Sequence, residues 1–280
     1  MDEYEATKAI DNLPIDVKVK MVAHTEACTA MAFNPMGDTL ATGGADKVVV
    51  LWNLKKMSEI ARFRSKSHSI CALAFSLDNH HLMSCSTDHR ATLYNLRGNI
   101  KPSHSFVAHQ DLITSTKFCY STKQVMTSSL DSTVKCWDIN TCNVSRVINT
   151  YSQCFDMHVS RSETYIATGH KDGNIKLWNA KTKESISKIE DAHSDPVACV
   201  RVSPDEHYVV STSKDDTIKI WDLRKQKLLQ TFEHEQFQLG SNNAKFCISP
   251  NSQYVICGSK NGNVVFYDMK NAECCNIIAD

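Results

Sequence analysis

The chain has 280 residues, with 31 basic and 31 acidic side chains and therefore no formal net charge. Non-specific binding of nucleic acid needs a basic excess, so this balance argues against a nucleic-acid-binding protein of that kind. The sequence has no run of 18 apolar residues, and residues 1–16 are acidic and polar. We therefore expect no membrane-inserted helix and no secretory signal, but a flexible segment at residues 1–16.

From residue 17 onwards the chain repeats one pattern. In each of six repeats a Ser, Thr or Cys is followed four residues later by an Asp or Asn, and six residues after that by an aromatic ring. The rings are Trp52, Tyr94, Trp137, Trp178, Trp221 and Tyr267, which lie 41 to 46 residues apart. A fixed period of this length is typical of proteins in which each repeat forms one structural unit.

Each repeat is predicted to contain four antiparallel strands. The first strand alternates apolar and polar residues and is expected at 29–33, 69–75, 115–118, 154–159, 198–202 and 244–248. A second strand precedes the Asp turn, and a third strand ends at the ring and buries every second residue, such as Ile218 and Ile220. Four such strands form one blade of a β-propeller. We therefore predict an all-β propeller over residues 17–280.

The number of blades follows from the fourth, outer strands. The sequence has six turns with an Asp or Asn but seven segments with the composition of an outer strand. These segments are residues 17–22, 59–63, 104–107, 145–148, 186–190, 228–232 and 273–278. The surplus strand at 17–22 favours an open ring, a seven-blade pattern that lacks most of its last blade. The alternative is a closed six-blade ring in which one terminal strand is spare. An open ring leaves unpaired strand edges, which proteins normally avoid.

Three repeats contain a His, a hydroxyl, an Asp and a Trp at equal offsets. The sets are His24, Thr42, Asp46 and Trp52; His109, Thr127, Asp131 and Trp137; His193, Ser211, Asp215 and Trp221. A Ser-His-Asp constellation is typical of hydrolases. A catalytic site, however, occurs once in a protein, whereas these sets recur with the repeat. We therefore predict structural hydrogen-bond networks and no catalytic residue.

The other three repeats depart from this pattern. His68 stands only 20 residues before Asp88, and Thr150 occupies the position expected for a histidine. In the last repeat Cys257 and Asn261 replace the hydroxyl and the Asp. We expect weaker networks in these repeats, because fewer groups can pair.

The cysteines indicate the compartment. Most of the twelve lie in apolar strand segments, as Cys71, Cys136 and Cys199 do, where a free thiol acts as a small hydrophobic residue. No C-x-x-C motif and no phosphate-binding glycine loop is present, so we expect no metal and no cofactor. The prediction is a cytoplasmic protein with reduced thiols.

The residue before each turn Asp or Asn is expected to project from one rim of the ring. The series is Ala45, Thr87, Leu130, Lys171, Lys214 and Lys260, so the last three repeats present lysines. The lysines are either simply solvated or form a binding site for an acidic or phosphorylated segment of a partner protein.

The repeat phrases resemble those of the WD-repeat family. The third strands end in LWN, CWD, LWN and IWD, with an Asp six residues before most of the rings, over residues 17–278. The segment VAHTEACTAMAFNPMGDTLATGGADKVVVLW is also similar to the first blade of the autophagy-related protein 16 family. So are the stretch DLRKQKLLQTFEHEQFQLGSNNAKFCISPNSQYVICGSKNG, which includes Phe237, Gly240 and Ser241, and the second repeat at residues 87–91.

This resemblance implies a non-catalytic scaffold that supports autophagosome formation. Members of that family join an N-terminal coiled coil to a C-terminal propeller. The resemblance implies that the propeller recruits partners to the machinery that attaches a ubiquitin-like modifier to phosphatidylethanolamine. Its expected partners are proteins, namely the conjugation complex or cargo receptors, and its expected location is cytoplasmic with recruitment to autophagosomal precursor membranes. No heptad repeat precedes residue 17, so the chain would carry only the recruiting half.

Two alternatives remain at this point. One is a generic WD-repeat adaptor in another cytosolic complex, such as a ubiquitin-ligase receptor or a ribonucleoprotein assembly. The other is a hydrolase that uses one of the His, Ser/Thr and Asp sets.

Overall fold

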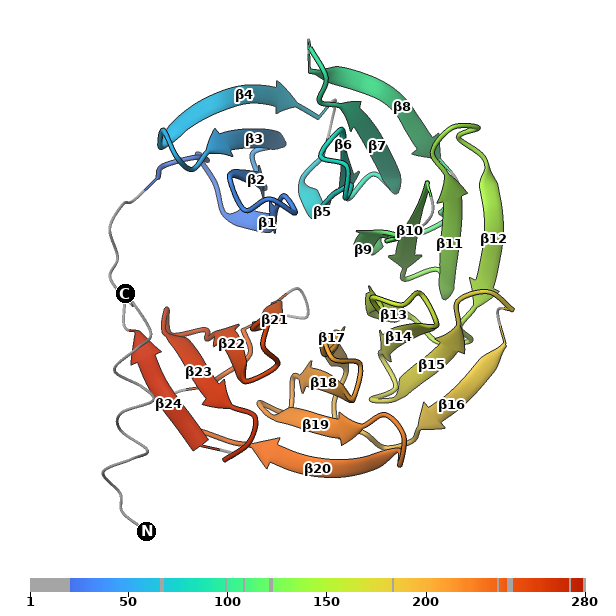
Figure 1. The fold of residues 1–280 in the computed structure, drawn as a ribbon, viewed down its shortest axis with the longest axis vertical. Helices are drawn as coiled ribbons and strands as arrows, with labels where there is room; N and C mark the ends of the chain where they lie inside the picture. Colours follow the sequence, from blue (N-terminus) through green and yellow to red (C-terminus); the bar gives the residue numbers. More distant parts are fainter. Residues whose placement is uncertain are drawn as a thin grey trace.

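The computed structural model describes residues 21–278, except 66, 67, 99, 108, 121, 122, 183, 236, 241–243 and 272. These residues form β-strands and turns and no helix. The strands make six four-stranded antiparallel sheets, which are arranged around a central axis like the blades of a fan (Figure 1). In each blade the strands follow one another from the axis outwards.

The strand bounds repeat from blade to blade. The innermost strands are β1 (Cys28–Phe33), β5 (Ile70–Phe75), β9 (Ile113–Phe118), β13 (Cys154–Val159), β17 (Val197–Val202) and β21 (Phe246–Ile248). The second strands are β2 (Thr39–Gly44), β6 (His81–Ser86), β10 (Gln124–Ser129), β14 (Tyr165–His170), β18 (Tyr208–Ser213) and β22 (Tyr254–Gly258). The third strands are β3 (Val48–Asn53), β7 (Arg90–Asn95), β11 (Thr133–Asp138), β15 (Ile175–Asn179), β19 (Ile218–Asp222) and β23 (Val264–Asp268). The outer strands are β4 (Ser58–Arg64), β8 (Lys101–Val107), β12 (Val144–Asn149), β16 (Ser185–Ile189), β20 (Lys227–Phe232) and β24 (Glu273–Ile278).

The predicted all-β propeller with six repeats is confirmed. Six of the seven expected outer strands are present, within three residues of their predicted bounds. For the seventh, residues 17–20 lie outside the described residues, and Met21 and Val22 belong to no strand. The expected flexible segment at residues 1–16 also lies outside them.

The turn between the second and third strands has the same backbone conformation in every blade. The residue after the turn Asp or Asn has a positive φ, between 58° and 90°, at Lys47, His89, Ser132, Gly173, Asp216 and Gly262. This left-handed conformation reverses the chain and is strained for residues with a Cβ. At Gly173 a Cβ would also lie 2.3 Å from the backbone oxygen of His193, so glycine is required there by space as well.

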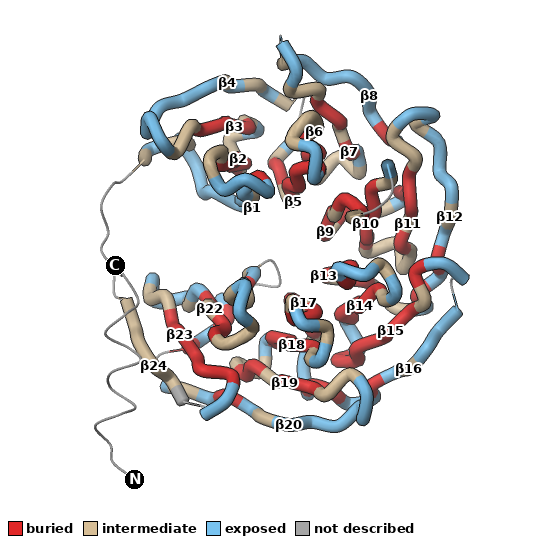
Figure 2. The backbone as a smooth tube through the Cα atoms, viewed as in Figure 1, coloured by how far each residue is buried: buried red, intermediate tan, exposed pale blue. Residues whose placement is uncertain are grey.

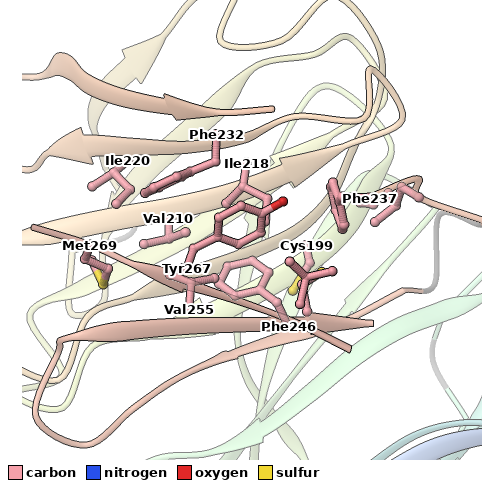
Figure 3. Packing of buried hydrophobic residues seen from close by; sticks show 14 residues of the cluster. Cys199, Val210, Ile218, Ile220, Phe232, Phe237, Phe246, Val255, Tyr267 and Met269 are labelled. Atoms are coloured by element: carbon pink, nitrogen blue, oxygen red, sulfur yellow. The ribbon is translucent and has the colours of Figure 1, made fainter. Parts of the chain in front are cut away.

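The hydrophobic core lies between neighbouring blades. Between blades five and six, Val210 and Ile218 from one sheet meet Val255, Tyr267 and Phe246 from the other (Figure 3). All five side chains are buried. Each blade thus depends on its neighbour to cover its apolar face, which is the reason why single blades do not fold alone.

Blades six and one do not cover each other in this way. Figure 1 shows them on either side of an interruption in the ring, and the innermost strand β1 is largely exposed in Figure 2. Met31 and Phe33 of β1 are 63% and 59% exposed, whereas their equivalents on β5, Leu73 and Phe75, are 9% and 8% exposed. The described residues therefore form six blades in an open arrangement, and the seven-blade pattern stays a prediction.

Candidate functional site

Three blades carry the same hydrogen-bonded chain of four side chains. In blade three the Trp137 indole N–H donates to the Thr127 hydroxyl at 2.8 Å, and this hydroxyl lies 2.8 Å from His109 Nε2. The other ring nitrogen, Nδ1, lies 2.8 Å from Asp131 Oδ2. Blades one and five repeat the arrangement at 2.8 to 3.1 Å, through His24, Thr42, Asp46 and Trp52 and through His193, Ser211, Asp215 and Trp221. The structure thus brings these residues together in the sets that the sequence predicts.

The Asp of each network also holds the turn between the second and third strands. Asp131 accepts the backbone N–H groups of Gln110 and Thr133 in addition to the histidine ring. The Thr133 hydroxyl donates to the same carboxylate at 2.6 Å, and the Thr217 hydroxyl donates to Asp215 at 2.7 Å. These two threonines are not among the residues predicted from the sequence, although both stand two residues after the Asp.

The directions of the hydrogen bonds show that the groups of these networks are already engaged with one another. A carboxylate only accepts, so the histidine carries its proton on Nδ1, and Nε2 accepts from the hydroxyl. The hydroxyl also accepts a hydrogen bond from the indole N–H, so it acts as both donor and acceptor within the network. The Thr127 and Ser211 side chains are also fully buried. Burial raises the pKa of Asp131, but hydrogen bonds from His109 and Thr133 outweigh this effect and hold the pKa below its usual value.

In blade four a different histidine joins the network but does not bond the turn Asp: His170 Nδ1 donates to the Ser152 carbonyl at 3.2 Å, and Asp172 accepts the backbone N–H of Asn174. Trp178 donates to the Thr168 hydroxyl at 2.8 Å, and this hydroxyl lies 2.7 Å from His170 Nε2. His170 is the last residue of β14, and its spacing of two from Thr168 places both side chains on one face of the strand. Burial, and then the charge of Lys176, lower the pKa of His170 to about 4, so the ring is neutral at pH 7. This network lacks the turn Asp, in line with the weaker network that Thr150 predicts here, although the sequence pattern does not mark His170.

Blades two and six keep only part of the network. His68 Nδ1 lies 4.0 Å from Asp88 Oδ2, which is beyond hydrogen-bond distance, and the His68 side chain is 53% exposed. In blade six Cys257 takes the place of the hydroxyl, and Asn261 is exposed and accepts a backbone N–H of its own turn. The hydroxyl of Tyr267 is buried and has no hydrogen-bond partner among the described residues.

We expect Tyr267→Phe to stabilise the protein by about 1 kcal/mol, because an orphaned buried polar group costs roughly 1–3 kcal/mol. The ring lies among apolar side chains of blades five and six, so phenylalanine fills the same space (Figure 3). Urea unfolding followed by circular dichroism measures the shift. Tyr94→Phe is the matched control, because the Tyr94 hydroxyl is hydrogen-bonded to Ser84 and its loss should be destabilising. A lower unfolding midpoint for Tyr267→Phe would contradict the prediction.

The six residues that precede the turn Asp or Asn lie at one end of the ring. In each blade the backbone N–H of this residue donates to a carbonyl in the segment before or at the start of the blade, at 2.8 to 3.3 Å. The donors are Ala45, Thr87, Leu130, Lys171, Lys214 and Lys260. The three lysines lie on consecutive blades, four to six, and are exposed. None of them forms an ion pair with a described residue. We define Lys171, Lys214 and Lys260 as the basic rim.

All twelve cysteines are free thiols. Within the described ranges, no group of three or more His, Cys, Asp or Glu side chains is arranged to hold a metal ion. The same part of the chain has no helix that could cross a bilayer.

The sequence matches the family described as "WD domain, G-beta repeat" in six segments, residues 17–53, 57–95, 100–138, 144–179, 184–222 and 227–268. Protein tipD of Dictyostelium discoideum is 29% identical over 268 residues, which are 95% of this chain and 44% of that protein. Autophagy-related protein 16 of Arabidopsis thaliana is 23% identical over 269 residues, which are 96% of this chain and 52% of that protein. WD repeat-containing protein 1 of Xenopus tropicalis is 27% identical over 194 residues, which are 66% of this chain and 32% of that protein.

The chain therefore spans about half the length, or less, of these curated relatives. The names of these relatives are diverse. Each matched segment contains the three inner strands of one blade, with the turn Asp or Asn and the aromatic ring that follows it. From the second segment on, each segment begins with the outer strand of the preceding blade. With six matched repeats that fold into six blades, this chain belongs to the WD domain, G-beta repeat family of propeller scaffolds.

Proposed function

We propose that this chain is a non-catalytic protein-interaction scaffold of the autophagy-related protein 16 type. In this proposal it supports autophagosome formation by recruiting partners to the machinery that lipidates a ubiquitin-like modifier. The observation that carries the proposal is the similarity to autophagy-related protein 16, which extends over 96% of the chain. The location proposed is the cytoplasm, with recruitment to autophagosomal precursor membranes.

The basic rim is the proposed binding surface for an acidic or phosphorylated partner segment. Its three ammonium groups lie on neighbouring blades and are free to pair with anionic groups. The carboxylate next to Lys214 in sequence, Asp215, is engaged by His193 and Thr217 and therefore competes little for the lysine. Contacts with charged groups of this kind give specificity and a fast association rate more than high affinity.

Changing Lys171, Lys214 and Lys260 together to Glu is expected to abolish capture of such a partner, because the substitution replaces attraction with repulsion. Affinity purification from the source cell, followed by mass spectrometry, provides the readout. Recovery of the lipid-conjugation machinery or its cargo receptors with the unchanged chain supports the autophagy proposal. In the matched control, three lysines on turns at the other end of the blades are changed to Glu, namely Lys55, Lys56 and Lys225. This control variant has the same net charge as the rim variant.

Two results would contradict these proposals separately. Unchanged capture by the rim variant would remove the basic rim as the binding surface. Recovery of a ubiquitin-ligase or ribonucleoprotein complex in place of the lipid-conjugation machinery would replace the autophagy proposal with the adaptor alternative. That alternative is favoured by the diversity of the relatives, which include nuclear distribution protein nudF of Aspergillus niger and protein SOF1 of Saccharomyces cerevisiae.

A further inference from the structure

The innermost strands place one residue from each blade at the same level of the central channel. Each of these residues pairs with the third residue of the second strand in its blade, as Lys117 does with Met126 and Arg201 with Val210. The six residues are Ala32, Ala74, Lys117, His158, Arg201 and Cys247. At this level, blades one and two present small apolar side chains and blades three to five present basic ones.

A cavity of about 410 Å³ opens at this level. Its wall on blades one and two is apolar and includes Met31, Phe33 and Phe75. Its wall on blades three to five includes Lys117 and Arg201, together with His158. No Asp or Glu lines the cavity. The volume lies within the range of pockets that hold ligands in proteins, and the two walls differ in polarity.

The basic wall has a positive excess. The nearest carboxylate, Asp156, is fully buried and is engaged by Arg201, by the backbone N–H of Val200, and by Lys245 Nζ at 2.8 Å. Arg201 and Lys245 therefore already share one carboxylate. The Lys117 side chain forms no hydrogen bond or ion pair with a described residue, and burial, followed by repulsion from Arg201, lowers its pKa to about 8.

His158 adds a neutral donor to the same wall. The backbone N–H of Val202 donates to His158 Nδ1 at 3.3 Å, so the ring proton resides on Nε2. Burial, with help from Lys117 and Arg201, lowers the pKa of His158 well below its usual value. The Nε2–H group is therefore a donor beside two cations, a combination that suits an anionic acceptor.

We propose that this end of the channel binds an acidic segment of a partner protein, with a Glu or Asp carboxylate against Lys117, His158 and Arg201 and a neighbouring large apolar side chain against Met31, Phe33 and Phe75. Charge complementarity selects the carboxylate, and the apolar wall selects the residue beside it. A free small anion would leave this apolar wall uncovered, so the observations favour a peptide.

The site is separate from the basic rim. The turns of the basic rim adjoin the start of the innermost strands, whereas the cavity lies beside their ends. A strand of six residues spans about 20 Å, so the two surfaces lie at opposite ends of the channel. The inference therefore does not depend on the proposed function, and either can fail alone.

Isothermal titration calorimetry of the full chain with capped synthetic peptides tests the inference. The probes are Phe-Glu-Leu-Glu-Phe and its neutral counterpart Phe-Gln-Leu-Gln-Phe. We expect the Glu peptide to bind at least about tenfold more tightly, with an affinity that falls as salt is added. Lys117→Met should reduce the affinity for the Glu peptide to that for the Gln peptide. This variant removes a partly buried, unpaired charge, so its fold should be retained, and circular dichroism checks this.

Lys214→Met is the matched control, since it removes one lysine from the other end of the channel and should leave the affinity unchanged. Equal affinities for the two peptides, or no heat of binding for either at millimolar concentration, would overturn the proposal. So would a Lys214→Met variant that weakens binding as much as Lys117→Met does.

Discussion

Replacing Asp131 with alanine is expected to destabilise the protein by about 3 kcal/mol, the size of effect seen when one partner of a buried, hydrogen-bonded pair is removed. The carboxylate accepts from the His109 ring, from the Thr133 hydroxyl and from two backbone N–H groups. Alanine leaves all of these donors without their acceptor. The side chains of His109 and Asp131 are 0% and 7% exposed, so water cannot readily take the place of the lost carboxylate.

The matched variant is Asn261→Ala at the equivalent turn of blade six. Asn261 is exposed, and the blade lacks the histidine and the hydroxyl that would complete the network. We expect a loss below about 1 kcal/mol, as for one exposed hydrogen bond. Urea unfolding followed by circular dichroism compares the two variants. Equal unfolding midpoints would refute the ranking of the blades.

Stability is expected to fall as the pH is lowered from 7 to 4, before the carboxylates are protonated. Burial lowers the pKa of His158, His170 and His193 in the folded protein. As the pH falls, the unfolded chain binds protons at these rings before the folded protein does. The contribution of the neutral rings to the free energy of unfolding is therefore fully present above the unfolded pKa of about 6.5 and is lost as the pH falls below it. For His170, with a folded pKa of about 4, the loss amounts to about 3 kcal/mol.

A second loss should follow below pH 4. The folded-state pKa values of Asp131 and Asp215 are lowered, so their contribution is present above an unfolded pKa of about 3.9 and is lost as pH falls further. Unfolding midpoints in urea between pH 7.5 and 4 measure the first loss. His170→Gln should flatten this part of the profile, and His207→Gln, at an exposed position, should not. A flat profile of the unchanged chain between pH 7 and 4.5 would contradict the prediction.

The repeat spacing predicted the blades and three of the networks because both depend on local geometry. A hairpin of fixed length carries Thr127, Asp131 and Trp137 to fixed positions, so equal offsets in the sequence become equal contacts in the structure. The same spacing does not identify the histidine of blade four. There the hydroxyl needs a histidine within reach in space, and His170 supplies it from a position that the repeat does not mark.

The channel cavity shows where sequence reasoning stops. Lys117, His158 and Arg201 stand one repeat period apart, at 41 and 43 residues, but they differ in type, so no recurring residue marks the position. They line one cavity only because the sheets are arranged radially and the innermost strands share a register. Likewise, the exposure of Met31 and Phe33 depends on which blade stands beside β1, and not on their own segment.

By itself the sequence determined the all-β class, the four-strand repeat and the turn networks, since these follow from alternation and spacing within about 45 residues. Only the tertiary structure decided which residues of different blades meet, as in the basic wall of the channel, and which face of blade one stays uncovered. The physical reason is that contacts between blades depend on the packing of whole sheets, for which no single segment of the chain carries the pattern.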